Sequence, residues 1–317
     1  MKLHLDKDSF EAILLEVEQI SGIRADILEK DYYVTLLLKE LAGYQSELKA
    51  YFKGGTALYK ALGSIRRFSE DIDLTVAVDD CTSRTQAEKR LKKSAKGYTG
   101  LQIIEGESEE KRGSCTAVYK YYSIVSIDRL DALQRFERVK VEATSFTVSE
   151  PIESIVIAPK IFEIADDGRK KILSEVFSVK PFEIMTIKLE RIFIDKIFAS
   201  EYYYTRKMLF DTAKHIYDIS VLFNIDRIKN FIEKVDFVHE IVALKRSEEK
   251  ERHGGVPEDR NIKDFSYFEH LHNDNDFLTE FKKMQSVYVF NEKDVISFSR
   301  ASETIKKLNK VFLSLEI

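Results

Sequence analysis

The chain has 317 residues, of which 44% are hydrophobic and 33% are charged. This composition excludes a disordered chain and a collagen-like chain, and the length favours two domains that can each bury a core. The 54 acidic and 50 basic side chains leave a net charge of −4. The chain therefore lacks the general basic excess that is typical of nucleic-acid-binding proteins.

The cysteines and the apolar segments point to the cytoplasm. Two cysteines, Cys81 and Cys115, are too few for a disulfide framework and fit no CxxC zinc pattern, so we expect two reduced thiols. No apolar run is long enough to span a membrane. Residues 1–20 mix acids with apolar side chains and contain no signal-peptide cleavage site. We therefore expect a cytoplasmic protein without a membrane contact.

The first third of the chain alternates between helix and strand patterns. Apolar residues at three- and four-residue spacing predict helices, and strict alternation predicts strands. The glycine pair Gly54-Gly55 interrupts these patterns, Thr56 can cap the helix that follows, and Gly63 can end it. The expected helices cover 8–20, 26–41 and the segment TALYKAL, and the expected strands cover 48–52 and 72–78.

The middle of the chain is mixed, and the end is helical. Basic residues from Arg84 to Lys96 predict a basic amphipathic helix. Strands are expected over 116–127, 138–146 and the segment IESIVIA, and helices over 181–200, 205–223, 226–246, 264–284 and 293–314. The predicted fold class is therefore α/β, with a small mixed sheet over residues 1–165 and an α-helical domain over 166–317.

The segment FKGGTALYKALGSIRRFSEDIDLTV holds the sharpest chemical signal. Gly54 and Gly55 follow a strand and open a helix, so the backbone can approach a phosphate near free N–H groups. The segment contains neither a P-loop motif nor GxGxxG. Asp71 and Asp73 share one strand face, and two neighbouring carboxylates repel each other unless a cation lies between them. A Mg²⁺ site for phosphoryl transfer is one interpretation, and a solvated sheet edge is the other.

Glu142 is the candidate for a third carboxylate. In the segment RVKVEATSF the apolar residues alternate with Lys140, Glu142 and Thr144, which share the opposite face. A carboxylate at the centre of a strand is unfavourable without a partner. The segment is therefore either the third part of a metal site or the polar face of an edge strand.

The order of a glycine pair, DxD on a strand and a carboxylate on a later strand resembles the polymerase-β-type nucleotidyltransferases. The chain also resembles the AbiEii/MenT family of nucleotidyltransferase-like toxins. Four segments carry this likeness: EKDYYVTLLLKEL (29–41), FKGGTALYKALGSIRRFSEDIDL (52–74), PFEIMTIKLERIFIDKI (181–197) and KHIYDISVLF (214–223). The resemblance implies an active site in a cleft between an α/β domain and a helical domain.

The resemblance also implies roles for single residues. Lys196 matches a lysine that contacts nucleotide phosphates, although a lysine in an apolar stripe frequently reaches to solvent instead. Asp218 matches an aspartate on the following helix, and a salt bridge to Lys214 is its structural alternative. Ser69 matches a serine that can contact the nucleotide, or it is a turn residue.

Lys30 and Asp31 match the family's N-terminal helix motif. An ion pair within or between helices explains these two charged residues nearly as well as a direct role in the reaction.

The expected function is that of a Mg²⁺-dependent nucleotidyltransferase toxin. Asp71, Asp73 and Glu142 would hold the metal, and Gly54, Gly55 and Thr56 would cradle the phosphates of an NTP. The resemblance implies transfer of a nucleoside monophosphate, with the tRNA 3′ end as acceptor, and an antitoxin encoded by a neighbouring gene. A protein or small-molecule acceptor and an inert NTP-binding module remain the alternatives.

Overall fold

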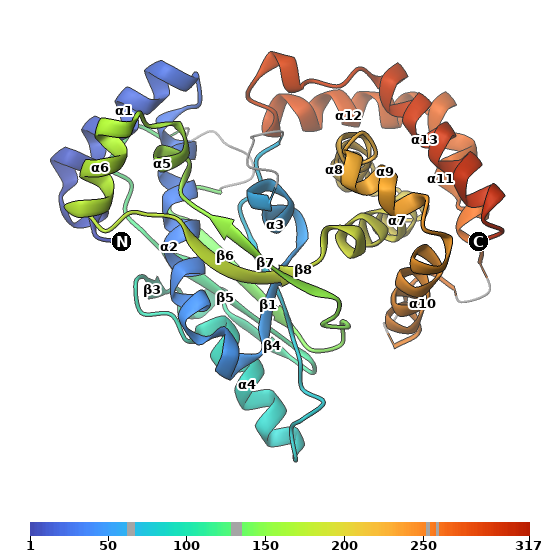
Figure 1. The fold of residues 1–317 in the computed structure, drawn as a ribbon, viewed down its shortest axis with the longest axis horizontal. Coiled ribbons are helices and arrows are strands. Elements are labelled where there is room, and N and C mark those ends of the chain that lie inside the picture. The colour runs from blue at the N-terminus through green and yellow to red at the C-terminus, as the bar shows by residue number, and fades with distance from the viewer. Residues whose placement is uncertain (62–66, 128–134, 252–253, 258–259) are drawn as a thin grey trace. The chain divides into compact units, whose positions relative to one another are not determined.

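The computed structural model describes residues 1–61, 67–127, 135–251, 254–257 and 260–317. The chain forms two compact units, Met1–Ile187 and Lys188–Ile317. The first unit contains a mixed sheet with helices, and the second is built from helices (Figure 1). The predicted α/β fold class with a helical C-terminal region is therefore confirmed.

The sheet of the first unit has the strand order β3-β5-β6-β2-β1-β8-β7, and β4 pairs with β5. Strands β2 and β6 are parallel, as are β1 and β8, and the other pairs are antiparallel. The strands are β1 (Ala50–Lys53), β2 (Ile72–Val76), β3 (Gln102–Ile103), β4 (Glu109–Lys111), β5 (Ser114–Lys120), β6 (Arg138–Thr144), β7 (Ile152–Ile157) and β8 (Phe182–Ile187).

Helix α2 crosses the sheet and contacts β1, β2, β6 and β8 (Figure 1). Alternate residues of the central strands, such as Ile72, Leu74 and Val141, are buried, because successive side chains of a strand point to opposite faces. The helices of this unit are α1 (Lys7–Ser21), α2 (Ala25–Leu48), α3 (Gly54–Ala61), α4 (Arg84–Lys96), α5 (Lys160–Ile164) and α6 (Asp167–Glu175). Short 3₁₀ helices cover Leu3–Leu5 and Glu105–Glu107.

Helix α8 is central in the second unit, where it packs against α7, α12 and α13. Its residues Ile216 and Ile219 are fully buried, as are Phe193 and Ile197 of α7. The helices are α7 (Leu189–Thr205), α8 (Leu209–Leu222), α9 (Asp226–Ile232), α10 (Val235–Glu251), α11 (Ser266–His270), α12 (Asn275–Tyr288) and α13 (Phe298–Ser314). Three 3₁₀ helices cover Ile262–Asp264, Leu271–Asn273 and Glu292–Asp294.

The structure corrects the helix that the sequence predicts over 181–200. Its first part is strand β8, which pairs with β7 over six residues and with β1 at Phe52 and Thr186. The segment Phe182–Ile187 is short and mostly apolar, and such a run has no period that separates a strand from a buried helix. Pairing with neighbours that are distant in sequence decides the outcome.

Smaller boundary differences concern the ends of elements. Leu48 ends helix α2 instead of opening a strand, and β5 stops at Lys120, so the strand expected over 116–127 is too long. The helix expected over 226–246 is two helices, α9 and α10, and the one expected over 264–284 is divided by a 3₁₀ segment. Gly63, which was expected to end α3, lies outside the described residues.

Candidate active site

The junction of β1 and α3 requires glycine at two consecutive positions. Gly54 has φ +79°, and a β-carbon there would lie 2.2 Å from Oδ2 of Asp73. A β-carbon on Gly55 would lie 2.7 Å from Oγ of Ser69. Positive φ is strained for residues with a β-carbon, and neither approach leaves room for one. The glycine pair therefore lets Asp73 and Ser69 reach the start of helix α3.

Thr56 joins this junction to the segment before β2. Its hydroxyl lies 2.5 Å from the carbonyl oxygen of Asp71 and 3.0 Å from Oγ of Ser69. Helix α3 already begins at Gly54, so the prediction that Thr56 caps it is wrong. The hydroxyl bonds to the neighbouring segment because β2 pairs with β1 and brings Asp71 alongside the helix. Thr56, Ser69 and Asp71 thus lie together.

The predicted carboxylates lie on one face of adjacent strands. Asp73 on β2 is paired in register with Glu142 on β6, and on its other side with Lys53 on β1. Asp71 lies two residues before Asp73, so its side chain shares the same face. Thr116 on β5 continues the row beyond Glu142. Strand pairing thus brings together three carboxylates that lie up to 71 positions apart in the chain.

The electrostatics of this face are those of crowded negative charge. The pKa of Asp73 is raised from 3.8 to about 6 by burial first, and then by the charges of Asp71 and Glu142. Lys53 and Lys140 oppose this shift. Like charges that share a site disfavour each other's ionised forms. A cation bound at this face would relieve the repulsion.

Two lysines near these carboxylates were not among the predicted site residues. Nζ of Lys140 lies 3.3 Å from Oδ2 of Asp71 and 3.6 Å from Oε2 of Glu142. Nζ of Lys53 donates to the hydroxyls of Thr144 and Thr147 at 3.1 and 3.2 Å. The alternation that places Lys140 and Glu142 on one face was a usable signal. Lys53 directly precedes the glycine pair, but its proximity to β6 depends on the sheet order.

The fit of a divalent metal to this face rests on donor type and charge. Within the described ranges, no three Asp, Glu, His or Cys side chains form a ready-made metal site. Asp71, Asp73 and Glu142 nevertheless supply oxygen donors, which Mg²⁺ prefers. Their three negative charges exceed the two positive charges of Lys53 and Lys140. The residues therefore fit a divalent cation, which would draw their side chains closer together as it binds.

Three consecutive charged residues of α2, Glu29, Lys30 and Asp31, support the surroundings of the site. All three are at most 2% exposed. Lys30 donates to the carbonyl oxygen of Arg135 and forms an ion pair of 3.2 Å with Glu70, which directly precedes Asp71. The ion-pair interpretation of Lys30 is therefore the one that the structure shows.

Asp31 anchors helix α3 in the same way. Its carboxylate forms a buried ion pair with Lys60 of α3 and accepts a hydrogen bond of 2.6 Å from the backbone N–H of Lys160. Glu29 accepts hydrogen bonds from the Ser123 hydroxyl at 2.5 Å and from the backbone N–H of Ile124 at 3.0 Å. Each residue of the triplet therefore holds a different segment of the first unit in place.

In the helical unit, the predicted residues Lys196 and Asp218 form an ion pair. Nζ of Lys196 on α7 lies 2.8 Å from Oδ2 of Asp218 on α8, and both side chains are at most 6% exposed. Lys214, the alternative partner for Asp218, lies 3.0 Å from Asp211. Lys196 therefore does not reach to solvent from its apolar stripe. It is held by a carboxylate 22 positions later in the chain.

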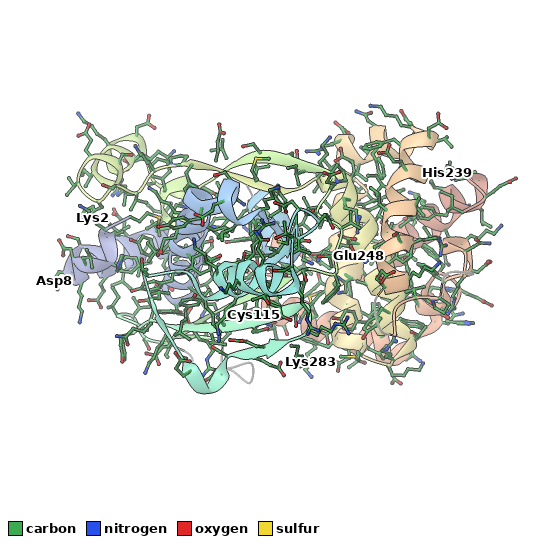
Figure 2. The ribbon with its side chains drawn as sticks, turned by 90° about the horizontal axis from the view of Figure 1, so that it is seen from below. Lys2, Asp8, Cys115, His239, Glu248 and Lys283 are labelled. Carbon is green, nitrogen blue, oxygen red and sulfur yellow. The ribbon has the colours of Figure 1, made fainter. Side chains whose placement is uncertain are left out.

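A second buried charge network lies beside this pair on α7. Arg191 forms ion pairs with Asp195 at 3.0 Å and with Glu248 at 2.6 Å, and Lys245 contacts the same Glu248 at 2.6 Å. Glu248 lies among the packed helices of this unit (Figure 2). The network ties α10 to α7.

The cysteines and the basic helix take no part in the carboxylate face. Cys115 is buried in the first unit (Figure 2), Cys81 is partly exposed, and both are free thiols. On α4, Arg90 pairs with Asp80 at 2.6 Å and Lys96 pairs with Glu110 at 2.7 Å. Much of the positive charge of α4 is thus neutralised locally.

No helix in the described part of the chain combines the length and the apolar character that a membrane crossing needs.

Comparison with known families gives one match that covers most of the chain. Residues 36–306 match the family described as nucleotidyl transferase AbiEii toxin, type IV toxin–antitoxin system. The match includes Asp71, Asp73, Glu142, Lys196 and Asp218. Among curated proteins, none matches the sequence significantly. Nucleotidyltransferases of this kind act on an NTP and generally use a divalent metal, and a toxin of such a system has an antitoxin partner. The chain belongs to the AbiEii family of nucleotidyltransferase toxins.

Proposed function

We propose that this enzyme uses Mg²⁺ to transfer a nucleoside monophosphate from an NTP to the 3′ end of tRNA, which would block translation and growth. The observation that carries the proposal is the carboxylate face: Asp73 is in register with Glu142, Asp71 lies beside it, and the face adjoins the start of α3. Three carboxylates this close together are unfavourable unless a bound cation, such as one that also binds a phosphate chain, compensates their negative charge.

The three carboxylates share one role in this proposal, and Glu142 has a second. Asp71, Asp73 and Glu142 would hold the Mg²⁺, which when bound stabilises negative charge on the phosphoryl oxygens. Glu142 is 42% exposed, so it is also open to an acceptor hydroxyl and can accept its proton.

The start of helix α3 is proposed to bind the triphosphate. The side-chain space at Gly54 and Gly55 is used by Asp73 and Ser69, so the phosphates would be held by backbone N–H groups. The Ser69 hydroxyl lies beside these groups, and its hydrogen bond of 3.0 Å with the buried Thr56 hydroxyl keeps it in place. We propose that Ser69 contacts the nucleotide directly.

Lys196 and Asp218 are proposed to act as a unit in the same reaction. A buried lysine keeps its charge when a carboxylate is paired with it, and Asp218 lies 2.8 Å from the ammonium. Such a charged, positioned lysine is suited to stabilise negative charge on transferring phosphates. Asp218 would then be the residue that positions Lys196.

The tRNA acceptor requires positive surface, because phosphate contacts supply most of the affinity for nucleic acid. Two exposed basic residues between α7 and α8 support this choice. The Arg206 guanidinium lies 3.7 Å from the centre of the Tyr202 ring, and the Lys207 ammonium lies 5.5 Å from the Tyr204 ring. Cations beside aromatic rings are suited to contact nucleotides.

The test is a transfer assay with purified protein, Mg²⁺, bulk tRNA and each α-labelled NTP in turn. We expect label on tRNA with at least one NTP, no label after EDTA treatment, and no label on tRNA with an oxidised 3′ end. Asp71→Ala should abolish transfer, whereas Asp79→Ala, which changes an exposed acid just after β2, should leave it intact. Label that moves to protein or to a small molecule, or transfer that survives Asp71→Ala, would contradict the proposal.

A further inference from the structure

The ammonium of Lys140 lies between two of the carboxylates that are proposed to hold the metal. Its ammonium lies 3.3 Å from Asp71 and 3.6 Å from Glu142, and so bridges two of the three carboxylates. The side chains of Lys140, Asp71 and Glu142 are 40%, 41% and 42% exposed. Solvent therefore reaches all three groups, and burial does not lock this bridge in place.

The chemistry of the bridge makes it reversible. A lysine ammonium is positively charged at neutral pH, and that of Lys140 lies between the carboxylates of Asp71 and Glu142. Lysine carries its charge on a flexible four-carbon stem, which allows the ammonium to move to another anion without a backbone change. A divalent cation at the same carboxylates would repel it.

The second lysine of this face is held differently. Lys53 is opposite Asp73 in the β1–β2 register, but its ammonium donates to the hydroxyls of Thr144 and Thr147. Two fixed hydroxyl acceptors give Lys53 a defined position. Lys140 spans two of the carboxylates directly.

We propose that Lys140 is an internal counter-cation that competes with the metal for Asp71 and Glu142, and that the phosphates of the bound nucleotide draw it away. This inference rests on the proposed function of the carboxylate face. Its consequence is that metal and nucleotide bind with positive coupling, since each removes a cost that the other would meet alone. The enzyme would hold metal weakly until an NTP arrives.

The test measures Mn²⁺ binding to the full chain by electron paramagnetic resonance of the free ion, with and without a non-hydrolysable NTP analogue. In the wild type, we expect the analogue to tighten Mn²⁺ binding about tenfold. Lys140→Met should bind Mn²⁺ about tenfold more tightly without the analogue, and the analogue should then add little. Lys140→Arg keeps the charge and should behave like the wild type.

Arg138→Met is the matched control. Arg138 lies two residues before Lys140 on the same face of β6, and its guanidinium is paired with Glu107 at 2.8 Å. The variant removes the same unit of charge from the same strand and should leave Mn²⁺ binding and its coupling to nucleotide unchanged. Circular dichroism of each variant verifies that it is folded.

Two results separate the possible failures. If Asp71→Ala and Glu142→Ala abolish Mn²⁺ binding but Lys140→Met binds Mn²⁺ as the wild type does, the competition proposed for Lys140 is refuted and the metal site stands. If Mn²⁺ binding survives both carboxylate substitutions, the proposed metal site and the inference built on it are both overturned.

Discussion

Replacing Asp73 by asparagine should stabilise the protein while abolishing its transfer activity. Asp73 is partly buried, and its pKa is raised from 3.8 to about 6 by burial and by the charges of Asp71 and Glu142. One pKa unit corresponds to about 1.4 kcal/mol, so the ionised carboxylate destabilises the folded state by about 3 kcal/mol at neutral pH. Solvent screening at a partly exposed position reduces the expected gain to about 1–3 kcal/mol.

The sign and the pH window of this gain follow from the raised pKa. A carboxyl whose pKa is higher in the folded state than in the unfolded state destabilises the fold wherever it is ionised. For Asp73 this cost is fully present above about pH 6.5, and it disappears as the pH falls from 6 towards 4. The advantage of Asp73→Asn over the wild type should shrink over the same interval.

Urea unfolding at pH 7.5, 6, 5 and 4 measures this effect. Asp79→Asn is the control, because Asp79 is exposed just after the same strand and should change stability by less than about 0.5 kcal/mol. A destabilised Asp73→Asn, or a gain that does not vary with pH, would refute the account of crowded charge. Retained transfer activity in this variant would refute the role of Asp73.

Three further predictions test other parts of the structure. Gly54→Ala should abolish transfer and lower the free energy of unfolding by about 3 kcal/mol or more, because a β-carbon would collide with the carboxylate of Asp73. The control Gly22→Ala, also at positive φ but in open space, should lower the free energy of unfolding in urea by only about 1 kcal/mol. Lys196→Met and Asp218→Asn should each lower the free energy of unfolding by about 3–5 kcal/mol. If the loss in the double variant equals the sum of the two single losses, the pair is not coupled and the prediction is wrong. Burial raises the pKa of Glu29 to about 7, so the destabilisation caused by its ionised carboxylate decreases as the pH falls from 8 to 5. A Glu29→Gln variant whose stability has the same pH profile as the wild type would contradict this.

Local patterns in the sequence were sufficient for much of the site. Alternation predicted that Asp71 and Asp73 share a strand face and that Glu142 lies on the same side as Lys140, because successive residues of a strand point in opposite directions. The glycine pair predicted room for a phosphate close to the backbone, and the structure shows the side chains of Asp73 and Ser69 in the space that a β-carbon would need. These features depend on residues that are adjacent or two positions apart.

Features that depend on distant pairing could not be predicted in the same way. The segment Phe182–Ile187 is a strand because β7 and β1 pair with it, and its own short apolar run does not distinguish strand from helix. The partner of Lys196 is decided by the packing of α7 against α8, since a helical wheel shows only neighbours on the same helix.

The sequence by itself thus determined the chemical groups of this protein and their order along the chain: a glycine turn, two carboxylates on one strand face, and a third on a later strand. The tertiary structure alone decided which charged side chains lie close to one another. The parallel register of β2 and β6 places Glu142 beside Asp73 and Lys140 between Asp71 and Glu142. Charge interactions depend on distance in space, and strand order and register set that distance.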